Sequence, residues 1–246
     1  AILPAGANAI MSEYIHPDFL SLDAQLSDDQ RLIRATVRRF VDERVMPQIA
    51  AHFRAGTFPH DLVPEMGALG MFGANLPGGD AEPIDAIAYG LINQELERGD
   101  SGVRSYVSVQ SSLCMWPIHT FGTDAQRARW LAPMRAGEAV GCFGLTEAES
   151  GSDPGSMRTT ARRDGGDYVL NGSKMWITNG TVADVAVVWA KLDGAVRGFL
   201  VEKGMPGYSA PEIKNKFSLR ASVTSELVFD NVRVPEENLL PGSAIG

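Results

Sequence analysis

The chain has 246 residues, 44% hydrophobic and 21% charged, which is enough for one large domain or two small domains with hydrophobic cores. Its 22 lysines and arginines against 30 aspartates and glutamates give a formal net charge of −8. This acidic balance argues against non-specific nucleic-acid binding, although it leaves room for a local basic pocket. No run of apolar residues approaches the ~20 that a membrane span requires, so we expect no membrane span.

The first half of the chain reads as helical. Ser27 followed by Gln30 is a capping-box pattern, so a helix should begin there. Apolar residues then recur near helical spacing at Ile33, Val37, Phe40, Val41 and Val45. Further helices are expected over residues 61–69, 83–98, 103–115 and 124–135. Pro83 should lie in the first turn of its helix, and Thr123 and Gly137 should begin and end the last one.

The pattern changes near Glu138 to short β-branched and aromatic runs separated by glycine, asparagine and aspartate. Strands are expected over residues 141–146, 157–163, 168–174, 185–191, 197–202 and 226–234. The Asp-Gly-Gly-Asp sequence at 164–167 and the Asp-Gly pair at 193–194 predict hairpins. This turn chemistry and close spacing favour an antiparallel sheet or barrel over a parallel one.

These patterns predict an α+β protein in which an all-α domain precedes a middle antiparallel β domain. We place an N-terminal extension over residues 1–25, the helical domain over 26–137, the β domain over 138–239 and an exit loop over 240–246. Residues 1–10 lack the basic start of a signal peptide, and Met11 is the natural start.

Several classes of site are excluded by absent motifs. Cys114 and Cys142 have neither metal-binding nor redox spacing, so we expect buried free thiols in a reducing compartment. The four histidines show no zinc spacing, and we predict no metal. The sequence also lacks the glycine fingerprint of a dinucleotide-binding fold, the phosphate-binding P-loop and the nucleophile elbow of a serine hydrolase.

The segment 142–154 (CFGLTEAESGSDP) carries the most chemical information. A strand ends in small and hydroxyl residues and runs into a Gly-Ser-Asp turn, whose backbone N–H groups and hydroxyls can bind anions or polar ring edges. Taken alone, the segment is equally compatible with an ordinary serine- and glycine-rich hairpin.

A second segment, 174–180 (KMWITNG), follows at the distance of one hairpin. Trp176 and Thr178 share a face of a strand with period two. An aromatic wall beside a hydroxyl donor suits a planar heteroaromatic cofactor. The residues alone leave open a core tryptophan beside a sheet threonine.

Together the two segments resemble the acyl-CoA dehydrogenase family, and the resemblance runs from about Leu26 to Gly242. It implies a helical N-terminal domain, a middle β domain and a C-terminal helical domain, with FAD bound at their junction. It also implies removal of the α and β hydrogens of an acyl-CoA substrate.

The resemblance implies flavin contacts from Phe143, Leu145, Thr146 and Ser152 in the first segment and from Trp176, Ile177 and Thr178 in the second. Ser152 should also touch the thioester substrate, and the Thr178 hydroxyl should lie near flavin N5. Hydride arrives at N5, where fixed donors stabilise the negative charge of the reduced ring. Ala148 stands where the family usually has proline, which removes no donor.

The segments 95–105 (ELERGDSGVRS), 107–113, 216–224 (KFSLRASVT) and 234–238 resemble the glutaryl-CoA dehydrogenase branch. In that branch the counterparts of Arg104 and Ser105 hold the distal carboxylate of the substrate, and the counterpart of Glu97 helps arrange this end of the pocket. A guanidinium pairs well with a carboxylate. The residues themselves leave open that Arg104 is a solvated helix-cap residue. We assign no ligand to the last two segments.

The family's proton-abstracting glutamate belongs to the C-terminal helical domain, which we expect to be missing from this chain, so we assign no catalytic residue here. The resemblance implies oxidation and decarboxylation of glutaryl-CoA to crotonyl-CoA in fatty acid and amino acid catabolism, with electrons passed to an electron-transfer flavoprotein. It also implies a homo-oligomer, tetramer or dimer, in the cytoplasm or, in a eukaryote, the mitochondrial matrix. Alternatives are a monocarboxylic acyl-CoA dehydrogenase or an acyl-CoA oxidase on the same scaffold, or an incomplete non-catalytic subunit.

Overall fold

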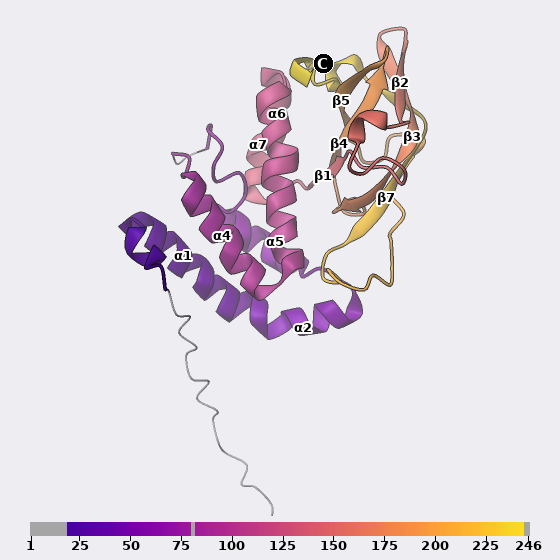
Figure 1. Cartoon of the computed structure of the whole chain (residues 1–246). Helices are drawn as coiled ribbons and strands as arrows, with labels where there is room; N and C mark the ends of the chain where they lie inside the picture. The colour runs from indigo at the N-terminus through magenta and orange to yellow at the C-terminus, as the bar shows by residue number, and fades with distance from the viewer. Residues whose placement is uncertain (1–18, 80–81, 244–246) are drawn as a thin grey trace, which may run out of the picture.

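Helices and strands segregate along the chain, with the helices on one side of the molecule and the sheet on the other (Figure 1). The computed structural model describes residues 19–79 and 82–243. The predicted order, an all-α part followed by a β part, is confirmed. Most of the predicted extension over residues 1–25, including the expected start at Met11, and the last three residues of the predicted exit loop lie outside the described residues.

The first helix begins where the capping pattern predicts. Ser27 Oγ accepts a hydrogen bond from the Gln30 backbone N–H (3.2 Å), and the Gln30 side chain accepts one from the Ser27 N–H (3.0 Å). This helix, α1 (Asp28–Phe40), continues through a π-helical stretch (Val41–Val45) into α2 (Met46–Ala55). Gly56, with φ 72°, ends α2 in the left-handed region that favours glycine.

The other predicted helices are present with shifted bounds. They are α3 (Val63–Ala68), α4 (Ala86–Gly99), α5 (Ser101–Ser108) with a π-helical stretch after it (Val109–Met115) and α7 (Asp124–Ala136). A further helix, α6 (Trp116–Phe121), was not predicted. The placement of Pro83 in a first turn was wrong: α4 begins later because the Asp85 carboxylate caps it, accepting the Ala88 N–H at 2.7 Å. Within the described ranges, no helix is long and apolar enough to cross a membrane.

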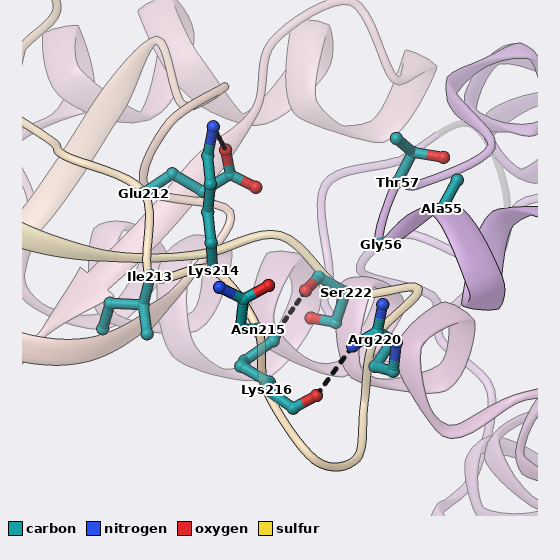
Figure 2. A pocket seen from close by; sticks show the side chains of 10 residues that line it. All are labelled: Ala55, Gly56, Thr57, Glu212, Ile213, Lys214, Asn215, Lys216, Arg220 and Ser222. Carbon is teal, nitrogen blue, oxygen red and sulfur yellow. Dashed lines mark hydrogen bonds and ion pairs between the residues drawn. The ribbon is translucent and has the colours of Figure 1, made fainter.

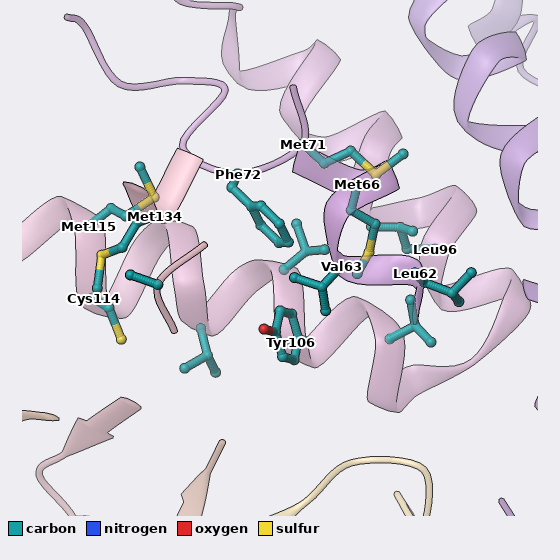
Figure 3. Close-up of a cluster of buried hydrophobic side chains, with 14 of the residues drawn as sticks. Leu62, Val63, Met66, Met71, Phe72, Leu96, Tyr106, Cys114, Met115 and Met134 are labelled. Carbon is teal, nitrogen blue, oxygen red and sulfur yellow. The ribbon is translucent and has the colours of Figure 1, made fainter. Parts of the chain in front are cut away.

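The helical core is built around aromatic and sulfur-containing side chains (Figure 3). Tyr106 is almost fully buried and stacks on Phe58, with ring centroids 4.5 Å apart. Cys114 and Cys142 are both buried and free, as predicted, and burial raises the pKa of each thiol. The same core includes strand residues, so the sheet packs directly against the helices.

The sheet has seven strands in the order β1-β4-β2-β3-β7-β6, with β5 paired to β4. Their bounds are β1 (Gly141–Gly144), β2 (Thr160–Asp164), β3 (Asp167–Thr178), β4 (Val185–Leu192), β5 (Ala195–Glu202), β6 (Tyr208–Ser209) and β7 (Thr224–Val234). Both predicted hairpins, β2–β3 and β4–β5, are confirmed.

The sheet is mainly antiparallel, as expected, but one region departs from that pattern. Strand β4 runs parallel to β1, pairing Gly141 with Val185, and parallel to β2, pairing Thr160 with Lys191. The chain leaves β1, forms the β2–β3 hairpin and only then returns as β4 beside β1. Turn chemistry identifies hairpins between consecutive strands, but it carries no signal for such a crossover.

The segment between β6 and β7 reaches across to the helices. The Arg220 guanidinium donates to the carbonyls of Phe53 (3.0 Å) and Arg54 (3.0 Å) at the end of α2. Gly102, in the first turn of α5, lies so close to this segment that a Cβ atom there would stand 2.8 Å from the Ala221 carbonyl carbon. The absence of a side chain at Gly102 therefore permits α5 and the segment between β6 and β7 to pack closely.

We predict that Gly102→Ala lowers the free energy of unfolding by about 1–3 kcal/mol, because the neighbouring backbone must shift. Gly90→Ala in α4 is the matched control: a Cβ there meets nothing within 4 Å, so helix propensity should raise stability by ~1 kcal/mol or less. Urea denaturation of the two variants measures both. Similar behaviour of the two variants would contradict the packing assigned to Gly102.

Candidate functional site

The two chemically informative segments lie side by side. The backbone N–H of Met175 in β3 donates to the carbonyl oxygen of Thr146 at 2.8 Å. Beyond Thr146 the chain turns tightly, since Glu147 and Ser150 exchange backbone hydrogen bonds of 3.2 Å. The end of β1 is therefore fixed against β3 just before Trp176.

A buried ion pair fastens this junction. Lys174 is fully buried in β3, and its Nζ donates to Glu147 Oε1 at 2.8 Å and to the Leu145 carbonyl at 3.1 Å. The Glu147 carboxylate also accepts the backbone N–H groups of Arg158 (2.6 Å) and Thr159 (3.0 Å). One carboxylate thus joins three segments of the chain.

The electrostatics of the pair follow from its surroundings. Burial raises the pKa of Glu147, but the backbone N–H groups of Arg158 and Thr159 and the Lys174 ammonium outweigh this and lower the pKa to about 2. Burial lowers the pKa of Lys174, and the Glu147 carboxylate opposes that change. Glu147 is therefore a firmly ionised structural anion, which the sequence did not reveal.

Strand β3 carries a bulge at the position of the predicted cofactor wall. Its register with β7 shifts between Lys174 and Ile177, and Trp176 has φ 64°, a conformation that is strained for an aromatic residue. As a result the Trp176 side chain is 61% exposed, whereas Ile177 is buried in the core of the sheet. Backbone strain of this kind is concentrated at functional sites.

Trp176 and Thr178 line one groove of about 410 Å³. Thr178 lies opposite Thr224 in the β3–β7 ladder, and Thr224 lines the same groove. The facing wall comes from residues 213–219 together with Ser222, in the segment between β6 and β7. This arrangement places an aromatic face beside hydroxyl groups, as the sequence pattern suggested.

The facing wall was missed at the sequence level, where the segment 216–224 received no ligand. Its Phe217 is 100% exposed, and Asn215 and Leu219 both have positive φ. A large apolar residue at the tip of a lysine- and serine-rich turn is the signal that was present in the sequence. Only the β3–β7 pairing shows which strand the turn faces.

A second hollow, of about 260 Å³, lies on the other side of the same segment, against the end of α2 (Figure 2). Lys216 and Arg220 both line this hollow, and Arg220 Nη1 donates to the Lys216 carbonyl at 3.0 Å. Arg220 is thereby held between its own segment and the α2 carbonyls.

The other residues of the predicted cofactor wall line neither hollow. Phe143 is half-buried and packs edge-to-face on Trp189, with centroids 6.2 Å apart. Leu145 and Thr146 are also half-buried, and Ser152 is exposed beyond the turn. The Thr146 backbone is hydrogen-bonded to β3. The Ile177 side chain points into the core, so only the backbone of Ile177 could contact a ligand in the groove.

The predicted substrate-carboxylate residues come together at the α4–α5 junction. Asp100 breaks the helix there with φ −166° and ψ 135°, yet Arg104 Nε still donates to Glu97 Oε2 at 2.6 Å. Hydrogen bonds from Ser101 and Arg104 lower the pKa of Glu97. Ser105 is half-buried beside them. The Arg104 side chain is 34% exposed and paired, so it is neither a freely solvated cap nor buried.

Among the residues that the structure describes, no cluster of three or more histidine, cysteine, aspartate or glutamate side chains is placed to hold a metal ion.

We predict that Lys174→Met lowers the free energy of unfolding by about 3–5 kcal/mol, because it leaves the Glu147 carboxylate buried and uncompensated. Adding Glu147→Gln should recover part of this loss, since the amide oxygen keeps an acceptor without the charge. Arg44→Met, which removes an exposed partner of Glu65, is the control and should cost about 1 kcal/mol or less. Urea denaturation checks all three; a loss in Lys174→Met no larger than in Arg44→Met would contradict the role of the pair.

Comparison with known proteins identifies the family of this chain. Residues 27–138 match the family model of the acyl-CoA dehydrogenase N-terminal domain, and residues 142–232 match that of the middle domain. The chain is 36% identical to the mitochondrial short-chain specific acyl-CoA dehydrogenase of Bos taurus, covering 90% of this chain and 55% of that protein.

Two solved structures are also similar. A glutaryl-CoA dehydrogenase from Mycobacterium smegmatis in complex with FADH2 is 53% identical with a TM-score of 0.90, covering 92% of this chain and 58% of that one. Butyryl-CoA dehydrogenase from Megasphaera elsdenii is 35% identical with a TM-score of 0.82, covering 90% and 60%. The chain thus spans somewhat more than half the length of these relatives. It belongs to the acyl-CoA dehydrogenase family.

Proposed function

We propose that this protein acts in an FAD-dependent acyl-CoA dehydrogenase reaction, with glutaryl-CoA as the substrate and crotonyl-CoA as the product after decarboxylation. One observation carries the proposal: an exposed, strained Trp176 and Thr178 line a groove directly after the point where the Thr146 segment is bonded to β3. The similar Mycobacterium smegmatis enzyme was solved with FADH2.

The residues present fit a flavin ring. The groove of about 410 Å³ has an apolar aromatic wall, two threonine hydroxyls and two lysines, which suits a planar ring with polar edges. The strained backbone at Trp176 leaves the indole 61% exposed to solvent. A stacked ligand would cover that surface.

In this proposal the described residues bind and orient. Trp176 supplies a stacking face, the Thr178 hydroxyl a hydrogen bond to the ring edge, and the Thr146 segment further polar contacts, with Ser152 beside the thioester. Bound FAD supplies the hydride acceptor. Fixed donors around the ring stabilise charge that develops there without reorganising.

Two acidic residues of the predicted site segments, Glu147 and Glu97, are already engaged. Glu147 is buried with Lys174, and Glu97 accepts from Ser101 and Arg104. Neither is positioned by its contacts to remove a proton from a substrate carbon. We therefore assign both to structure and positioning, and neither as the catalytic base.

The choice of glutaryl-CoA is supported by the α4–α5 junction. Arg104 donates to Glu97 through Nε and to Ser108 through Nη1 (3.3 Å), and a guanidinium has five N–H donors, so donors remain for a substrate carboxylate. The 53% identity with the Mycobacterium smegmatis glutaryl-CoA dehydrogenase points the same way.

A second candidate is a monocarboxylic acyl-CoA dehydrogenase. The Glu97 carboxylate already pairs with Arg104, which reduces the net positive charge available to a substrate carboxylate. In either case we propose an electron-transfer flavoprotein as the electron acceptor and a homo-oligomeric assembly.

We predict that the purified chain binds FAD and that Trp176→Ala weakens binding about tenfold, since the stacking face is lost. Trp116→Ala is the matched control: Trp116 is a tryptophan of α6 that is 44% exposed and lies outside the groove, so it should leave the Kd unchanged. Quenching of flavin fluorescence measures both. Equal effects of the two substitutions would place the flavin elsewhere.

We predict that Arg104→Ala raises the KM for glutaryl-CoA about 10- to 100-fold, because a charge-assisted bond to the distal carboxylate is lost. The KM for butyryl-CoA, which lacks that carboxylate, should change little. Arg39→Ala, on the exposed face of α1, controls for loss of a surface charge. Parallel increases for both substrates would favour the monocarboxylic candidate while leaving the flavin site untouched.

A further inference from the structure

A lysine side chain is anchored in the groove that Trp176 and Thr178 line. The Lys216 Nζ donates to the Ser222 carbonyl and to Thr224 Oγ1, the latter at 2.6 Å. Ser222 and Thr224 line the groove with Lys216, and Thr224 is the cross-strand partner of Thr178. The ammonium group is thus held at one position rather than extended into solvent.

The backbone around Lys216 is itself fixed. The Ile213 N–H donates to the Thr224 carbonyl (2.8 Å), and the Asn179 N–H donates to the Val223 carbonyl (3.0 Å). These bonds tie the lysine-bearing segment to β7 and to the residue that follows β3. The distance from Lys216 to Thr178 therefore depends on the sheet and not on a free loop.

The other two cations of the segment have partners of their own, although Lys214 also lines the groove. Arg220 donates to the carbonyls of Phe53 and Arg54 at the end of α2. Lys214 faces Glu212 at 3.7 Å. An ammonium has three N–H donors, and Lys216 uses two of them in the bonds above, so one donor remains for a ligand.

The Lys216 ammonium is partly buried, which strengthens its interaction with a charged ligand. Burial lowers the pKa of Lys216, the Arg220 charge acts in the same direction and the Glu212 carboxylate opposes it. A partly buried charge is screened less by water than an exposed one. A ligand that becomes more negative during a reaction is therefore favoured in this groove over its neutral form.

We propose that Lys216 supplies a fixed positive charge beside the flavin ring and so favours the reduced, negatively charged ring over the oxidised ring. The inference rests on the proposed function and extends it to a residue of the facing wall. When the ring takes up two electrons and one proton it gains one negative charge, and a cation near its edge stabilises that state.

The test compares the Kd of the purified chain for oxidised FAD with its Kd for reduced FAD. The reduced cofactor is prepared with dithionite and titrated under anaerobic conditions. Lys216→Met should weaken binding of reduced FAD about tenfold more than binding of oxidised FAD. That ratio corresponds to a reduction potential lower by about 30 mV for a two-electron couple. Lys216→Arg, which keeps the charge, should restore most of the preference for reduced FAD. Lys203→Met, which removes an exposed lysine outside the groove, is the control that should leave the preference unchanged.

Lys216→Gln separates charge from anchoring, because its amide can still donate to the Ser222 carbonyl. The inference requires Lys216→Gln to lose the preference for reduced FAD while its urea unfolding stays close to that of the unsubstituted chain. Equal weakening of both FAD forms would overturn the inference and leave the proposed function standing. Absence of FAD binding by the unsubstituted chain would overturn both.

Discussion

The candidate site depends on the buried contact between Lys174 and Glu147. A fully buried lysine is tolerated only with a partner, and this one binds the carboxylate at 2.8 Å and the Leu145 carbonyl at 3.1 Å. The same carboxylate accepts two backbone N–H groups after the turn, at Arg158 and Thr159. The end of β1, the turn after it and β3 are therefore one unit, and the segments proposed to bind the cofactor inherit its rigidity.

The fixed position of Lys174 permits a bulge in β3 directly after it, between Lys174 and Ile177. The bulge before Ile177 moves Trp176 into solvent with φ 64° while Ile177 stays in the core. A regular strand would alternate its side chains and would not present Trp176 in this way. The exposed indole acquires a facing wall only because β7 pairs with β3 and brings the segment containing Lys216 alongside. Residues some 40 positions apart in sequence thus make one groove.

The helices and the sheet contribute different parts of the proposed chemistry. Residues of β3 and of the segment before β7 form the groove assigned to the flavin ring, whereas Arg104 and Glu97 lie on the helical side. The two sides meet where Gly102 touches Ala221 and where Arg220 binds the α2 carbonyls. This contact fixes α5, which carries Arg104, relative to the segment that carries Lys216. The residues proposed to bind the substrate carboxylate and those proposed to bind the flavin ring are therefore held by one interface.

The sequence by itself determined the elements and the chemical segments. The capping box at Ser27, both hairpins and the change from helices to strands rest on local propensity and turn chemistry, which act within a few residues. Only the tertiary structure decided the parallel pairing of β1 with β4, the burial of Glu147 on Lys174 and the position of Lys216 opposite Trp176. These join residues distant in sequence, and their energies come from desolvation and long-range pairing, for which a single chain read in order carries no periodic signal.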